Sequence, residues 1–192
     1  MTTETAGIRD AIQTLIGSYI EFPHALEVSA KEVPGAIYWL IRPHGQDYGK
    51  ISGKLGLHLS ALTFLIKSMC HANGQFATVT LLEPKIAVRF EPGPKKRVRD
   101  YDPTPAINVL LTILGHMGIG QHHVAALRQD QEPDQAFVEF NIFVRDPDSY
   151  KALTTPPAFD HHDQTAIGAL GTLFRAMANK VGIKCQLEVV LP

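Results

Sequence analysis

The stretch that decides the fold reads Asp47-Tyr48-Gly49-Lys50-Ile51-Ser52-Gly53-Lys54-Leu55-Gly56. A Walker-type phosphate loop needs four residues between its first Gly and the Gly-Lys pair, followed by Ser or Thr; here three residues intervene and Leu55 follows. The dinucleotide fingerprint also fails, because the glycine intervals are wrong and the stretch does not directly follow a predicted strand. Both common nucleotide-binding loops are therefore excluded.

A short glycine loop before an amphipathic helix remains as the interpretation. Without a Cβ atom, Gly53 and Gly56 let a sugar-phosphate backbone approach the main chain, and the N–H groups at a helix start favour anions. Lys50 and Lys54 add positive charge. The pattern predicts a clamp for single-stranded nucleic acid, and the alternative is a plain helix connection with two solvated lysines.

The elements around this loop follow a recognisable order. Ile8, Ile12, Leu15, Ile16 and Tyr19 predict a helix that ends near Phe22-Pro23. Strands are predicted at residues 24–29 and 36–42, joined by a turn that contains Pro34-Gly35, with one of Tyr38 and Trp39 facing the core. A second helix follows the loop and stops at Asn73-Gly74, and a strand at residues 76–82 completes the unit.

The same order returns in a degenerate form after residue 105. A helix carries Ile107 to Leu114, strands are predicted near residues 124–128 and 136–145, and a long helix ends near Gly182 before an alternating final strand. The sequence therefore predicts an α+β protein with domains at residues 1–84 and 105–192. Residues 85–104, basic and rich in Pro and Gly, are predicted to form the linker.

The order helix, strand, strand, helix, loop, helix, strand resembles the type II KH domain, and residues 49–56 with Ser60-Ala61-Leu62 are similar to the small bacterial single-KH RNA-binding proteins. The resemblance covers about residues 8–82. It implies that residues 53–56 hold RNA phosphates while neighbouring apolar side chains pack on bases. Ser52 stands where the family usually has a large aliphatic residue, and Leu57 where it often has a basic one, which predicts weaker affinity.

These inferences give one set of expected site residues. The expected RNA contacts are Lys50, Ile51, Gly53, Lys54, Leu55, Gly56 and His58, and the expected auxiliary phosphate contacts are Lys95, Lys96, Arg97 and Arg99. The function expected is non-catalytic binding of single-stranded RNA, with no cofactor and no metal. The alternative is a protein-interaction or assembly module that kept a KH-like fold without nucleic-acid binding.

The second copy lacks the glycine loop. Residues 153–163 hold Pro156-Pro157, which lack N–H donors, and two acids that repel phosphate, of which Asp163 is expected to cap the following helix. The second copy is therefore expected to pack, brace or recruit a protein partner or a second copy of the chain.

Charge follows the same division. Residues 1–99 hold 12 Lys or Arg and 8 Asp or Glu, whereas residues 100–192 hold 6 and 11, so only the first half is suited to a polyanion. No stretch is long and apolar enough for a spanning helix, and the amino terminus lacks a signal peptide, which predicts a cytoplasmic protein without a membrane partner.

The patterns of cysteine, histidine and acidic residues indicate no disulfide, metal site or catalytic site. Cys70 and Cys185 are far apart in apolar surroundings and are expected to be buried free thiols. The nine histidines lack a strong ligand spacing, and His122 and His123 would point to opposite faces of a strand. No paired carboxylates, Ser-His-Asp or Cys-His pattern is present, so no enzymatic activity is expected.

Overall fold

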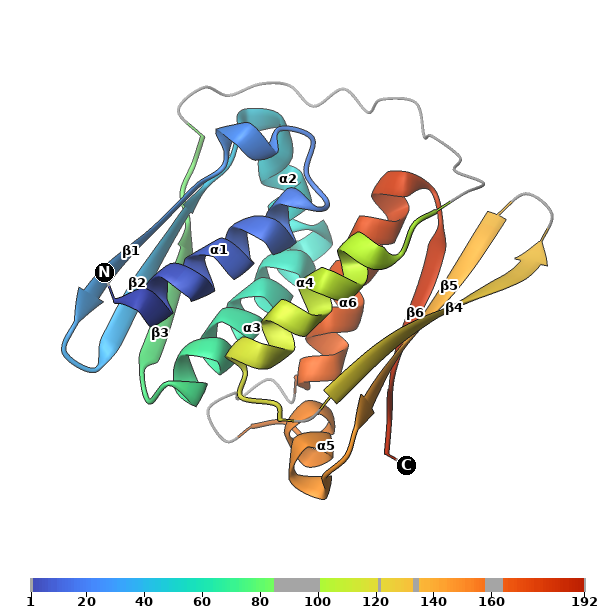
Figure 1. The fold of residues 1–192 in the computed structure, drawn as a ribbon. Coiled ribbons are helices and arrows are strands. Elements are labelled where there is room, and N and C mark those ends of the chain that lie inside the picture. The colour runs from blue at the N-terminus through green and yellow to red at the C-terminus, as the bar shows by residue number, and fades with distance from the viewer. Residues whose placement is uncertain (1, 85–100, 121, 133–134, 158–163, 192) are drawn as a thin grey trace. The chain divides into compact units, whose positions relative to one another are not determined.

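The structure is a computed structural model that describes residues 2–84, 101–120, 122–132, 135–157 and 164–191 (Figure 1). The chain divides into two compact units, Met1–Gly93 and Pro94–Pro192. Each unit contains helices and one three-stranded sheet with both antiparallel and parallel pairs. The predicted α+β class is confirmed. Most of the predicted linker lies outside the described residues.

The first unit has the sheet order β1-β2-β3. Helix α1 (Thr3–Gly17) precedes the hairpin of β1 (Glu27–Val33) and β2 (Ala36–Arg42), which pair antiparallel. The chain continues through α2 (Tyr48–Ser52) and α3 (Leu57–Ala72) to β3 (Phe76–Leu81), which pairs parallel to β2. Short 3₁₀ turns lie at Pro23–Ala25, Gly45–Asp47 and Lys54–Gly56.

Helices α1 and α3 cover one face of this sheet (Figure 1). The alternation of β2 sends Ile37, Trp39 and Ile41 into the core, fully buried, and leaves Tyr38 exposed, as the sequence predicts. Trp39 donates its indole N–H to the Cys70 sulfur at 3.4 Å. Cys70 is a buried free thiol, as expected, whereas Cys185 is free but only half-buried.

The second unit has the order β4-β5-β6. Helix α4 (Thr104–His116) precedes the antiparallel pair β4 (His122–Glu132) and β5 (Gln135–Val144), and α5 (Pro147–Thr154) and α6 (Ala166–Val181) lead to β6 (Lys184–Val190), parallel to β5. Phe140 of β5 packs edge-on against Phe174 of α6, with ring centroids 5.6 Å apart. This pair anchors the helix layer to the sheet.

Several predicted boundaries are wrong for local reasons. Helix α1 ends at Gly17 rather than near Phe22-Pro23, although Tyr19 and Ile20 stay buried beyond the helix and so continue its apolar pattern. The first strand begins at Glu27, because residues 23–25 form a 3₁₀ turn instead. Thr165, and not Asp163, caps α6 by accepting the Gly168 N–H at 3.1 Å. Asp163 itself lies outside the described residues.

Over the described ranges, no helix is long and apolar enough to cross a membrane.

Candidate functional site

The glycine loop, defined here as residues 53–56, joins α2 to α3 in the first unit. Three of its residues have left-handed backbone angles, with φ of 72° at Gly53, 56° at Leu55 and 77° at Gly56. The N–H of Gly56 donates to the Gly53 carbonyl at 3.2 Å, which closes the loop into a single tight turn. The loop therefore has one defined shape set by its own backbone.

His58 packs beneath the loop. A Cβ atom on Gly53 would lie 2.5 Å from His58 Cγ and 2.8 Å from the His58 backbone nitrogen, so any other residue here would force His58 to shift. The His58 Nδ1–H donates to the Lys50 carbonyl at 2.7 Å and ties the end of α2 to the start of α3. Tyr19 meets the His58 ring edge-on at 6.3 Å between centroids. These contacts make His58 a brace for the loop.

Leu55 forms the tip of the loop and is 92% exposed. It is the single residue other than glycine with a positive φ in the described part of the chain. A left-handed backbone at leucine costs about 1–2 kcal/mol, and an exposed side chain returns little burial energy to offset it. Leu57, 58% exposed at the start of α3, extends the apolar surface, and Lys54 is exposed beside it.

Lys50 is ion-paired on the protein itself. Its Nζ lies 3.1 Å from Glu21 Oε1 and 3.3 Å from Asp47 Oδ1. Asp47 is fully buried and also accepts the backbone N–H groups of Glu21 at 2.9 Å and Phe22 at 2.8 Å. The Lys50 charge is thus neutralised locally, and Asp47 fastens the loop after α1 to the start of α2.

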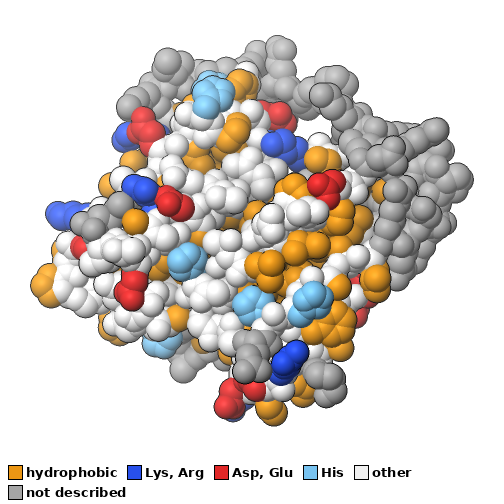
Figure 2. Space-filling model, in the orientation of Figure 1, with side chains coloured by type: hydrophobic (Ala, Val, Ile, Leu, Met, Phe, Trp, Pro, Cys, Tyr) orange, Lys and Arg blue, Asp and Glu red, His pale blue; other side chains and the backbone are white. Residues whose placement is uncertain are grey.

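Lys54 is consequently the loop cation that projects into solvent, whereas Ile51 is fully buried. The Ile51 side chain belongs to the core of the unit and cannot contact RNA in this conformation. Figure 2 shows Lys and Arg side chains scattered among acidic ones on the visible face, without one concentrated basic patch. The expected contacts Lys95, Lys96, Arg97 and Arg99 lie outside the described residues.

The glycine loop thus brings together a free lysine, an exposed leucine pair and an open backbone turn, held from below by His58 and the Asp47–Lys50 pair. Sequence reasoning missed Asp47 and Glu21. The i, i+3 spacing of Asp47 and Lys50 was a visible signal of an ion pair. The contact to Glu21 joins residues distant in sequence and left no such signal.

The second unit has no counterpart of this loop among its described residues. Between α5 and α6 the chain contains Pro156 and Pro157, and residues 158–163 are not described. The His122 Nδ1–H donates to the Ile119 carbonyl at 2.9 Å, and the His123 ring lies near the Phe143 ring, with centroids 6.3 Å apart. Across the residues that the structure describes, no group of three or more His, Cys, Asp or Glu side chains could hold a metal ion.

The chain was also compared with known proteins. No protein-family model, curated protein or solved structure matches it significantly.

Proposed function

We propose that the protein binds single-stranded RNA without catalysis and that the glycine loop grips the phosphate backbone. The observation that carries the proposal is the conformation of Leu55. Its backbone has a strained positive φ and its side chain is exposed at the tip of the turn. Backbone strain that stability does not require is typical of functional positions. The open turn offers main chain that a phosphate can approach closely.

Lys54 supplies the positive charge in this proposal, and Leu55 and Leu57 supply apolar surface for bases. Lys50 and His58 act differently from the sequence expectation, because both are engaged with the protein itself. They hold the loop in shape. With one free lysine, the electrostatic share of binding is small, and affinity is expected to be modest.

The topology supports the same proposal. Each unit has the order helix, two antiparallel strands, two helices and a third strand parallel to the second. This is the arrangement expected for tandem type II KH-like units, the second without the loop. In this proposal the second unit braces the first or recruits a protein partner or another copy of the chain, and the protein acts in the cytoplasm.

The direct test replaces Lys54 and Leu55 together with Asp and measures binding of a fluorescein-labelled, random-sequence single-stranded RNA by anisotropy. Binding should be lost while the circular dichroism spectrum and the unfolding midpoint stay close to those of the wild type. Lys67→Glu is the matched control, because Lys67 is exposed on α3 about 15 Å farther along the helix and should leave binding intact. Equal RNA affinity in the double variant removes the loop from the function.

A protein-interaction module is the second candidate. The exposed pair Leu55 and Leu57 together with the neutralised Lys50 favours it, since apolar surface without net charge suits a protein better than a polyanion. A salt titration separates the two functions. RNA affinity that falls as salt rises supports phosphate contact, whereas absence of RNA binding at low salt favours the protein partner.

A further inference from the structure

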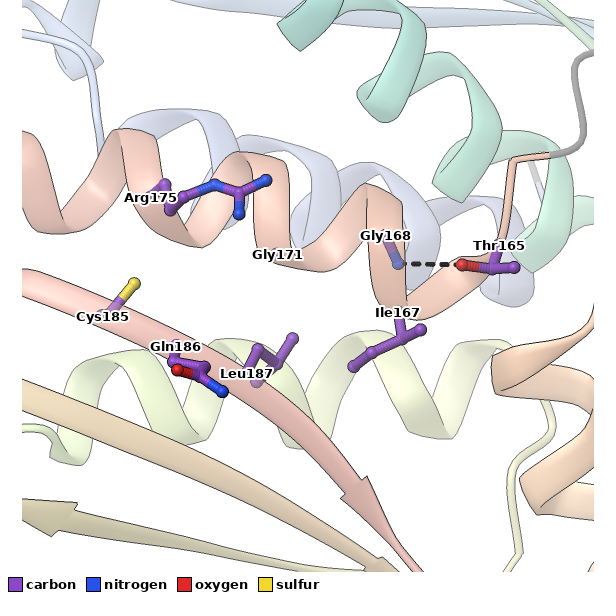
Figure 3. Close-up of a pocket in the computed structure, with 8 residues that line it drawn as sticks. All are labelled: Thr165, Ile167, Gly168, Gly171, Arg175, Cys185, Gln186 and Leu187. Carbon is purple, nitrogen blue, oxygen red and sulfur yellow. Dashed lines mark hydrogen bonds between the residues drawn. The ribbon is translucent and has the colours of Figure 1, made fainter.

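A pocket of about 470 Å³ lies between α6 and β6 in the second unit (Figure 3). Helix α6 and its N-cap provide Thr165, Ile167, Gly168, Gly171 and Arg175, and β6 provides Cys185, Gln186 and Leu187. Ile167 and Leu187 point toward each other across the gap, and the Cys185 thiol points toward α6 (Figure 3). The volume falls within the range of about 300–1,000 Å³ typical of small-molecule sites.

The pocket exists because α6 presents glycines to the edge strand. Gly168 and Gly171 are three residues apart and therefore share one helix face. Glycine is among the least favourable residues for a helix interior, and a Cβ atom on Gly171 would meet nothing within 4 Å. Packing therefore does not require Gly171. Its effect is to leave an open, flat helix surface.

The strand opposite this surface is incompletely covered. Val138 and Phe140, on the inner face of the central strand, are buried, whereas their register partners Cys185 and Leu187 on β6 are only half-buried. These apolar side chains face the helix but remain partly open to solvent, so a ligand that covered them would gain binding free energy by removing apolar surface from water. Cys185 and Leu187 thus give one wall of the pocket an apolar surface on which a flat apolar body can pack.

Arg175 gives the pocket its charge preference. Arg175 is exposed, and its side chain extends along α6 toward Gly171 (Figure 3). Its guanidinium donates a long, weak hydrogen bond of 3.5 Å to the Thr172 hydroxyl. Burial raises the pKa of the Cys185 thiol to about 11, although Arg175 lowers it, so the thiol is neutral near pH 7 and does not compensate the guanidinium. A guanidinium forms paired hydrogen bonds with carboxylate, sulfonate or phosphate groups.

We propose that this pocket binds a small organic anion, with a flat apolar body between α6 and β6 and its acidic group on Arg175. The Thr165 hydroxyl, which accepts the Gly168 N–H, lies at the opposite end and offers its own O–H to a polar substituent. The site is separate from the glycine loop and does not depend on RNA binding.

The test uses two probes of similar shape and different charge. 8-Anilinonaphthalene-1-sulfonate carries a sulfonate, and N-phenyl-1-naphthylamine has the same aromatic body without it; fluorescence titration measures both. The sulfonate should bind more tightly to the intact chain. Arg175→Gln should weaken sulfonate binding about tenfold, the worth of one charge-assisted hydrogen bond, and leave the neutral probe unchanged. Lys180→Gln, on the same helix but outside the pocket lining, is the matched control.

A size series at Gly171 tests the location. Gly171→Ala fits the open space and should keep binding, while Gly171→Leu should fill the pocket and abolish it for both probes; each replacement favours the helix, so folding is preserved. Equal affinity for the two probes, unchanged sulfonate binding in Arg175→Gln, or full binding in Gly171→Leu would each overturn the proposal.

Discussion

The two units share their order of elements and the pairing of their strands, but they use glycine in opposite places. In the first unit, glycines lie between two helices, where φ values above 70° at Gly53 and Gly56 make an open turn. In the second, Gly168 and Gly171 lie inside α6, where ordinary helical angles leave an open helix face. The same order of elements thus carries the glycine loop in the first unit and the pocket between α6 and β6 in the second.

The units also differ in how their second helical segment is fastened. Asp47 is fully buried and holds two backbone N–H groups and Lys50, whereas Asp146 in the second unit is a half-buried cap that accepts the Ser149 N–H at 2.7 Å. A fully buried carboxylate with several partners fixes the chain more strongly than a half-buried cap with one. In the first unit this network holds the start of α2, which leads into the glycine loop.

The largest effect should come from Asp47→Ala. Loss of the carboxylate leaves the Glu21 and Phe22 N–H groups and Lys50 without their buried acceptor, which should lower the stability of the first unit by about 3 kcal/mol or more. Urea unfolding measures this, followed by the fluorescence of Trp39 for the first unit and by helical circular dichroism, to which both units contribute. Asp47→Asn keeps one acceptor oxygen and should lose less. A loss in Asp47→Ala no greater than in Asp146→Ala would erase the contrast between the units.

A smaller loss is expected from Gly53→Ala. The left-handed backbone and the clash with His58 together should destabilise the first unit by about 2–3 kcal/mol. Gly56→Ala is the comparison variant. Gly56 also has a positive φ, but its ψ is 9° where that of Gly53 is 172°, and a Cβ atom there meets nothing within 4 Å, so only about 1 kcal/mol should be lost. Equal losses in urea titrations of the two variants would mean that His58 does not brace the loop.

Leu55→Asn should act in the opposite direction. Asparagine tolerates the left-handed conformation better than leucine, so the variant should gain about 0.5–1 kcal/mol of stability. If the loop binds RNA through Leu55, affinity for the labelled RNA should fall in the same protein. Stability measured by urea unfolding should then rise while affinity measured by anisotropy falls. A fall in both would contradict the proposal that Leu55 is kept for binding at the expense of stability.

The smallest effect concerns pH and the second unit. Hydrogen bonds from the Ser149 backbone N–H, and then from its hydroxyl, lower the pKa of the Asp146 carboxyl. Because the folded pKa lies below the unfolded value, the cap stabilises α5 above about pH 4 and its contribution disappears as pH falls further. The protection factor of the Ser149 amide, which is its intrinsic exchange rate divided by its measured rate at the same pH, should fall with acid in the wild type. In Asp146→Asn, whose capping side chain does not titrate, this protection factor should stay independent of pH.

Regular alternation and periodicity carried most of the predictable structure. The bounds of β2 were predicted residue by residue, because a continuous apolar run from Ala36 to Ile41 lies between the turn with Gly35 at φ 76° and Pro43. The end of α1 was not predicted correctly, because Tyr19 and Ile20 are buried by tertiary contacts after the helix has ended. The sequence pattern alone cannot distinguish burial on a helix face from burial of residues that follow the helix.

The loop itself was foreseeable from its glycines, and the i, i+3 spacing of Asp47 and Lys50 indicated one ion pair, but the contact of Lys50 with Glu21 was not foreseeable. Lys50 and Lys54 have the same charge and neighbouring positions, yet one is held by Glu21 and Asp47 and the other projects into solvent. Burial of Ile51 likewise depends on how α2 packs in the unit. The pocket between α6 and β6 could not be predicted, since it depends on how the helix packs against the strand in the folded unit.

Trp39 is the one tryptophan of the chain, and it lies in the core of the first unit beside the Cys70 sulfur. Its emission consequently reports on that half of the molecule alone. Melting of the two halves can be told apart in the intact polypeptide by comparing this optical signal with total helix content, without cutting the chain or attaching a dye.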